Sequence, residues 1–160
     1  MLFRSHAAAP NPAMICRMLR ACAEAALNLR GADAIGEVLG YLSSADHVNE
    51  TAPEREGVYQ RWPERAMNAE LRAQALAKDK RYEDALAVIE LSIAAWEQGG
   101  DAALDRLAEA TRIAGVIEGH WLGRKEQARD RLAPVIERCR AAGFSPGVDG
   151  LTRLRESLAQ

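Results

Sequence analysis

The segment RYEDALAVIE at residues 81–90 returns in altered form as RKEQARDRLA at residues 124–133. Its first five residues, 81–85, align with 124–128, so the second copy lies 43 residues further along the chain. In each copy an apolar residue follows the alanine by four positions and a glycine ends the helical pattern: Ile89 and Leu132, Gly100 and Gly143. A repeat of this length is typical of helical solenoids, in which each helix pair buries its apolar face against a stacked neighbour.

Apolar residues recur at helical spacing on both sides of this repeat, and nowhere do they alternate as in a strand. The predicted helices cover about 12–30, 33–44, 53–60, 63–77, 80–98, 102–122, 124–142 and 149–159. Asn11 before Pro12 is a typical helix start, residues 45–52 read as a polar turn, and Pro134 predicts a bend or break near residues 131–133. We expect residues 1–10 to be a disordered lead-in and 11–160 to form one helical-repeat domain.

The composition favours a helical protein that is not drawn to polyanions. The 160 residues are 48% hydrophobic and 28% charged, with a net charge of −2, which gives no general attraction to nucleic acid or to an anionic membrane. No run of about 18 apolar residues predicts a membrane span. The three cysteines, Cys16, Cys22 and Cys139, predict reduced thiols in a cytoplasmic protein. We expect Cys22 and Cys139 to lie in packed interiors.

The sequence contains no pattern that predicts catalysis or a bound cofactor. His6, His47 and His120 lack zinc-ligand spacing, and no glycine-rich phosphate loop or nucleophile motif occurs. We therefore expect a binding protein that is not an enzyme, with no cofactor and no metal. Arg124, Arg131 and Arg138 recur every seven residues; a solvated charged face is favoured over an anionic docking stripe. Three tryptophans, Trp62, Trp96 and Trp121, are interpreted as packing anchors.

The helix at 80–98 resembles the second helix of a tetratricopeptide repeat. Ala85 stands where paired helices touch, with Tyr82 three residues before it and Ile89 four after it, and Ala73 is the matching small residue on the preceding helix. The short loops within each pair require antiparallel helices. We predict an all-α fold of antiparallel helix pairs stacked as a tetratricopeptide-like solenoid. A generic helical bundle with accidental similarity is the alternative.

Turns at 29–33, 78–86 and 122–124, followed by Ala141-Ala142-Gly143-Phe144 and Asp149-Gly150-Leu151, carry a broader resemblance. Their order is similar to the helical-repeat region of MalT-like, LuxR-type bacterial transcription regulators. Such regulators place an NTPase module before the repeats and a helix-turn-helix after them, and this chain has neither motif. The resemblance implies an effector-sensing or protein-interaction module of a regulator. The alternative is a free-standing tetratricopeptide-like adaptor or chaperone that binds a partner peptide.

Candidate binding residues follow from the solenoid interpretation, because the first helix of each stacked pair usually lines the binding surface. We predict contacts from polar positions on two such helices: Glu70, Gln74, Arg106, Glu109, Arg112, Glu118 and His120. The expected partner is a protein, a peptide or a small-molecule effector, with no direct binding of nucleic acid by this chain and no membrane. Leu2-Phe3-Arg4-Ser5 reads like a translated sequencing adapter, so we expect a fragment of a longer protein.

Overall fold

A computed structural model describes residues 11–55 and 59–160, and the predicted disordered lead-in at 1–10 lies outside that part. The described residues form an all-helical fold without a strand, which confirms the predicted all-α class; Arg55 and Tyr59 form one isolated bridge. The elements are α1 (Pro12–Arg30), η1 (Gly31–Ala34), α2 (Ile35–Thr51), α3 (Arg61–Lys78), α4 (Tyr82–Glu97), η2 (Gly100–Ala103), α5 (Leu104–Val116), η3 (Ile117–Trp121), α6 (Lys125–Ala141) and α7 (Ser145–Ser157).

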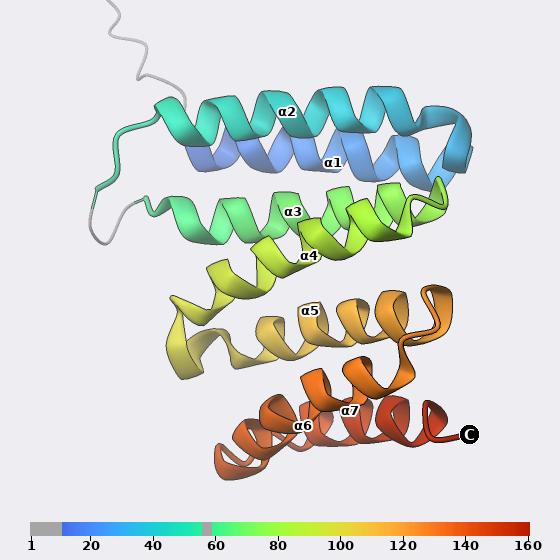
Figure 1. The fold of residues 1–160 in the computed structure, drawn as a ribbon. Helices are drawn as coiled ribbons and strands as arrows, with labels where there is room; N and C mark the ends of the chain where they lie inside the picture. Colours follow the sequence, from blue (N-terminus) through green and yellow to red (C-terminus); the bar gives the residue numbers. More distant parts are fainter. Residues whose placement is uncertain (1–10, 56–58) are drawn as a thin grey trace, which may run out of the picture.

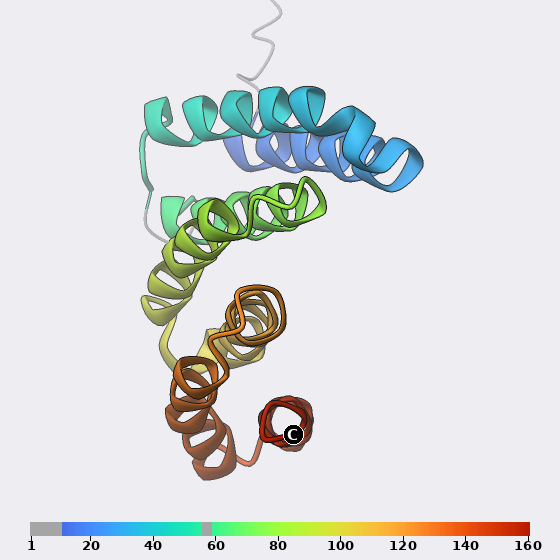
Figure 2. The same ribbon diagram turned by 45° about the vertical axis from the view of Figure 1, so that its right-hand side comes forward.

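The helices follow one another through the molecule in sequence order, from α1 and α2 at one end to α6 and α7 at the other (Figure 1). Each helix packs against the next one along the chain, with the most extensive contacts inside the pairs α1–α2 and α3–α4. Contacts also join α1 to α3 and α5 to α7, so helices that are separated by one helix in the sequence touch each other directly. Figure 2 shows α5 and α7 on the same side of α6.

Apolar residues of these helices form two buried clusters that share partly buried Leu39. The larger cluster extends through all the helices from α3 to α7. The smaller cluster joins α1 and α2 to Ala75 of α3. Ala73 and Ala85, the small residues expected where α3 and α4 touch, are both completely buried. Small side chains at such a contact let two helix backbones approach closely.

The 43-residue repeat also appears in the backbone geometry. Arg81 and Arg124, which precede α4 and α6, have nearly the same dihedral angles, φ −87° and ψ 64° against φ −88° and ψ 58°. The residue before each arginine is left-handed: Lys80 has φ 61° and Gly123 has φ 71°. Both helices therefore begin from one type of turn, although only the second copy has the glycine that this turn favours.

α2 is longer than predicted. It continues to Thr51, so the polar turn expected at 45–52 is wrong, and the described residues of the short helix expected at 53–60 are not helical. Buried Asn49 and partly buried Asp46 face other helices and are bonded there, so these polar residues do not end the helix. The extension places a polar cluster inside the molecule.

Two expectations near the C-terminus are also corrected. α6 is continuous through Pro134, so the helix does not break there; Pro134 is exposed. α7 begins at Ser145 rather than at 149, with Pro146 in its first turn, where a missing N–H costs little.

The cysteines are free, as expected, but only two of them are internal. Cys16 and Cys139 are buried, and Cys22 is exposed. The expected burial of Cys22 is wrong because its position in α1 faces outward, while Cys16 and Ala23 of that helix face the core.

Candidate functional site

A groove of about 550 Å³ lies between α3, α5 and η3. Its apolar wall consists of Ala77, Ile113, Val116, Ile117 and Trp121, and its polar rim of Gln74, Lys78, Glu109 and Arg112. This volume is within the range of about 300–1,000 Å³ that small-ligand sites occupy. The groove therefore combines an apolar surface with a few polar groups, which is the usual composition of a binding site.

Helical periodicity brings these side chains together. Gln74 and Lys78 are four residues apart, so they lie one turn apart on the same face of α3. Arg112 and Val116 have the same relationship on α5, three and seven residues after Glu109. Each helix thus presents one stripe to the groove.

The π-helical turn η3 positions the aromatic residue of the groove, Trp121. Leu122 donates its backbone N–H to the carbonyl of Ile117 at 3.0 Å, a bond that spans five residues instead of four. The ring of Trp121 lies 5.1 Å from that of Tyr82, centroid to centroid, and Trp121 stays 47% exposed. Such single π turns are rare and occur frequently at functional sites.

The charges on the rim add up to one net positive charge, from Lys78 and Arg112 against Glu109. Arg112 donates to both carboxylate oxygens of Glu109, at 2.8 and 2.7 Å. This hydrogen bonding raises the pKa of Arg112, so its guanidinium stays charged at every physiological pH. An anionic group in the groove would meet a favourable field.

Of the predicted binding residues, Gln74, Glu109 and Arg112 line the groove together. Arg106 and His120 are exposed outside its lining. The lining residues that were not predicted are Ala77, Lys78, Ile113, Val116, Ile117 and Trp121. The sequence pattern alone does not identify Ile113 and Val116 as wall residues, because helical periodicity does not distinguish a core contact from a groove wall.

The remaining two predicted residues, Glu70 and Glu118, are buried. Trp96 donates its indole N–H to Oε1 of Glu70, and the hydroxyl of Ser92 lies 3.4 Å from the same oxygen. Burial raises the pKa of Glu70 above its ordinary value of 4.5, against the opposing effect of the Trp96 hydrogen bond. Glu118 forms an ion pair with Arg131 at 2.8 Å. Both carboxylates therefore hold helices together.

The three arginines at seven-residue spacing form a ladder between α6 and α4. Each pairs with a glutamate 41 residues earlier, and these glutamates are also seven apart: Arg124 with Glu83, Arg131 with Glu90, and Arg138 with Glu97. The nitrogen–oxygen distances are 2.5, 2.7 and 2.7 Å. The arginines are thus already neutralised by the protein itself, which argues against an anionic docking stripe.

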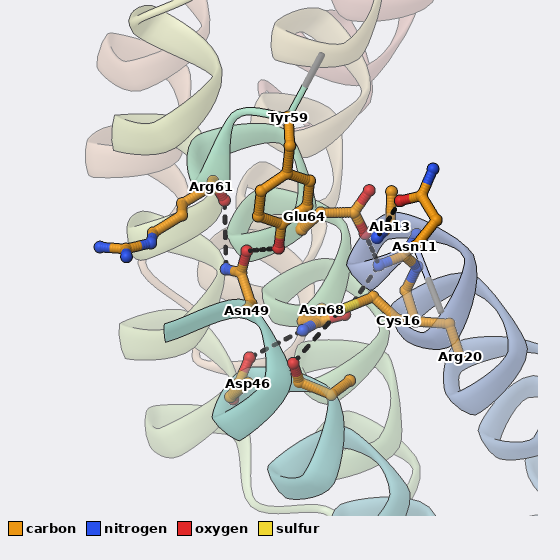
Figure 3. A network of polar contacts seen from close by, with 11 residues as sticks. Asn11, Ala13, Cys16, Arg20, Asp46, Asn49, Tyr59, Arg61, Glu64 and Asn68 are labelled. Atoms are coloured by element: carbon orange, nitrogen blue, oxygen red, sulfur yellow. Dashed lines mark hydrogen bonds and ion pairs between the residues drawn. The ribbon is translucent and has the colours of Figure 1, made fainter. Parts of the chain in front are cut away.

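A polar cluster links the first three helices (Figure 3). Arg20 of α1 is ion-paired with Glu64 of α3 and donates to Asn68 at 3.0 Å, and Asn68 donates to Asp46 of α2 at 2.8 Å. Beside it, Tyr59 donates its hydroxyl to Asn49 at 2.6 Å. Each of these buried or partly buried groups has a partner, so the cluster fixes how the helices pack.

The described residues contain no group of three or more His, Cys, Asp or Glu side chains arranged to hold a metal ion. Across the same residues, no helix combines the length and the apolar character needed to span a bilayer. No protein-family model matches the chain, and no curated protein sequence matches it.

Proposed function

We propose that this chain is a binding module, built as a tetratricopeptide-like solenoid, whose ligand occupies the groove between α3, α5 and η3. Two observations support the solenoid: packing runs from each helix to the next one or two along the chain, and α4 and α6 begin from matching turns 43 residues apart. The observation that carries the binding site is the groove itself, where three residues predicted from sequence meet an apolar wall.

The lining defines what the groove would take. Ile113, Val116 and the half-exposed ring of Trp121 suit an apolar side chain. Lys78 at the rim suits a carboxylate, because Arg112 is already paired with Glu109, and Gln74 adds an amide that can donate and accept hydrogen bonds. We therefore propose a peptide segment that combines an apolar anchor with an acidic residue.

The larger protein context rests on the sequence resemblance. We propose that the module senses an effector or partner for a bacterial transcription regulator of the MalT-like, LuxR-type class. A free-standing adaptor or chaperone that binds a partner peptide is the second candidate, and the groove suits it equally. The coding sequence distinguishes them: an NTPase module upstream and a helix-turn-helix downstream in the same reading frame identify the regulator.

The test of the binding site begins with selection of peptides from a randomised display library on the immobilised chain. The affinity of the best peptide is then measured by isothermal titration for the wild type and for Val116→Glu, which places a carboxylate in the apolar wall. The control is Leu91→Glu, which adds the same charge at an exposed apolar residue of α4 outside the groove.

We expect Val116→Glu to weaken binding at least about 10-fold, equal to about 1.4 kcal/mol, and Leu91→Glu to leave it unchanged. Lys78→Glu, at an exposed position, should also weaken an acidic peptide without disturbing the core. Equal affinities for the wild type and both groove variants would show that the peptide binds elsewhere.

A further inference from the structure

A second surface, away from the groove, is an apolar stripe on the outward face of α1. The stripe consists of Met14, Met18, Ala21, Cys22, Ala25 and Leu29, and all six residues are exposed. The three largest side chains are those of Met14, Met18 and Leu29, which are 53%, 61% and 83% exposed. At about 100° per residue, the six positions fall within an arc of about 100° on the helix.

The opposite face of α1 already has its partners. Cys16, Ala23 and Leu27 are buried on the side that packs against α2 and α3. The stripe runs from Met14 to Leu29, a length of about 22 Å along the helix axis. A surface helix normally presents polar residues to water, so a continuous apolar line opposite the core indicates an interaction surface.

We propose that the stripe binds a second copy of this chain, with the two α1 helices packed antiparallel about a twofold axis. The charges beside the stripe support this partner. Arg17 and Glu24 are exposed and lie on the same flank of the stripe. The point halfway between them along α1 is close to the midpoint of the stripe. Neither forms an ion pair with another residue in the described part of the chain.

In an antiparallel twofold pair, the same flanks of the two helices face each other. Arg17 of one copy then lies opposite Glu24 of the other, and the symmetry repeats this ion pair. A parallel twofold pair would set opposite flanks against each other, so Arg17 and Glu24 of the two copies would lie on different sides of the interface and form no ion pair. The stripe is therefore complementary to itself in one orientation only.

The sizes of the side chains fit the same arrangement. Ala21, Cys22 and Ala25 occupy the middle of the stripe, where the two helices approach most closely, and the larger residues lie at its ends. The antiparallel orientation brings Met14 of one copy against Leu29 of the other. A single helix face is smaller than the roughly 800 Å² per partner of a standard interface, so the dimer is weak, with a Kd on the order of 10–100 µM.

The first experiment is sedimentation velocity of the whole chain at concentrations from about 5 to 500 µM, which bracket this Kd. We expect a concentration-dependent dimer, and Met18→Lys should weaken it at least about 10-fold. The matched control is Leu91→Lys, because Leu91 on α4 is also 61% exposed and lies outside the stripe. Monomer at every concentration, or a dimer that Met18→Lys leaves intact, overturns the proposal.

The second experiment tests the orientation with exposed residues that do not contribute to the core. Arg17→Glu should weaken the dimer, and the double variant Arg17→Glu/Glu24→Arg should restore it. A short bismaleimide should join two copies through Cys22, the exposed thiol, because Cys16 and Cys139 are buried. If the double variant dimerises as weakly as Arg17→Glu, the antiparallel pair is wrong. The proposal is also overturned if the protein is monomeric and another segment of the same chain shields Cys22 from the reagent.

Discussion

The guanidinium of Arg131 donates a hydrogen bond from Nε to the carboxylate of Glu118, 2.8 Å away, and so joins α6 to η3. Its Nη2 also reaches Glu90 of α4 at 2.7 Å. The side chain of Glu118 is only 8% exposed, whereas that of Glu90 is 50% exposed. Arg131 therefore neutralises a buried carboxylate next to the wall of the groove.

Removing this guanidinium should be costly. We expect Arg131→Met to lower the free energy of unfolding by about 2–3 kcal/mol, because the substitution leaves a buried carboxylate without its ion-pair partner. The control is Arg124→Met in the same ladder, whose partner Glu83 has a side chain that is 63% exposed; it should cost under about 1 kcal/mol. Urea unfolding measures both values, and equal losses would contradict the special role of Arg131.

The buried carboxylate of Glu70 should make stability depend on pH. Its pKa is raised in the folded protein by burial, so the folded state holds this proton more tightly than the unfolded state. Stability from Glu70 is therefore present below its ordinary pKa of 4.5 and is lost as pH rises through the raised value.

Glu70→Gln removes that dependence while keeping an oxygen to accept from Trp96. We expect the variant to melt at a higher temperature than the wild type at pH 7, and this difference to shrink as the pH falls through the raised pKa and to vanish below about 4.5. Thermal unfolding of both proteins across this range gives the difference directly. A difference that grows toward acidic pH would have the wrong sign.

The left-handed residue before Arg81 offers a stabilising substitution. Lys80 has φ 61°, a conformation that costs residues with a side chain about 1–2 kcal/mol and costs glycine nothing. After the entropy that glycine loses on folding, Lys80→Gly should raise the free energy of unfolding by about 0.5–1 kcal/mol. Lys78→Gly, two residues earlier in α3, should lower it instead. Chemical denaturation distinguishes the two signs.

The chain alone should neither hydrolyse nucleotide nor select a DNA sequence. It has no glycine-rich loop with a lysine to hold phosphates, and its ladder arginines are paired with glutamates. A phosphate-release assay, and titration of random and promoter-derived duplexes at about 0.15 M salt, check both expectations. Turnover above background or a sequence preference would contradict them.

The sequence predicted the helices best where local capping decides their ends. Asn11 accepts from the N–H of Ala13 at 3.0 Å, and Gly31 and Gly143 end their helices as expected. It failed at residues 45–52, where Asp46 and Asn49 looked like turn residues. Their partners come from α3 and from the segment before it, which no local pattern reveals.

The candidate site was predicted only in part for a related reason. Polar residues on the first helices of the pairs pointed to Gln74, Glu109 and Arg112, but apolar wall residues look like core residues in a sequence. The π turn that places Trp121 has no recognisable sequence signal. The ladder could have been found, because Glu83, Glu90 and Glu97 share the seven-residue spacing of the arginines.

The central claim is that ligand binding occurs in the groove between α3, α5 and η3. The most direct test is titration of the ¹⁵N-labelled chain with the peptide selected from the display library, followed by two-dimensional NMR. We predict that the indole N–H of Trp121 and the backbone amides of Gln74, Arg112 and Val116 shift progressively, while those of α1 stay in place. Shifts confined to α1 or to the outer face of α4, with the Trp121 indole unmoved, would contradict the claim.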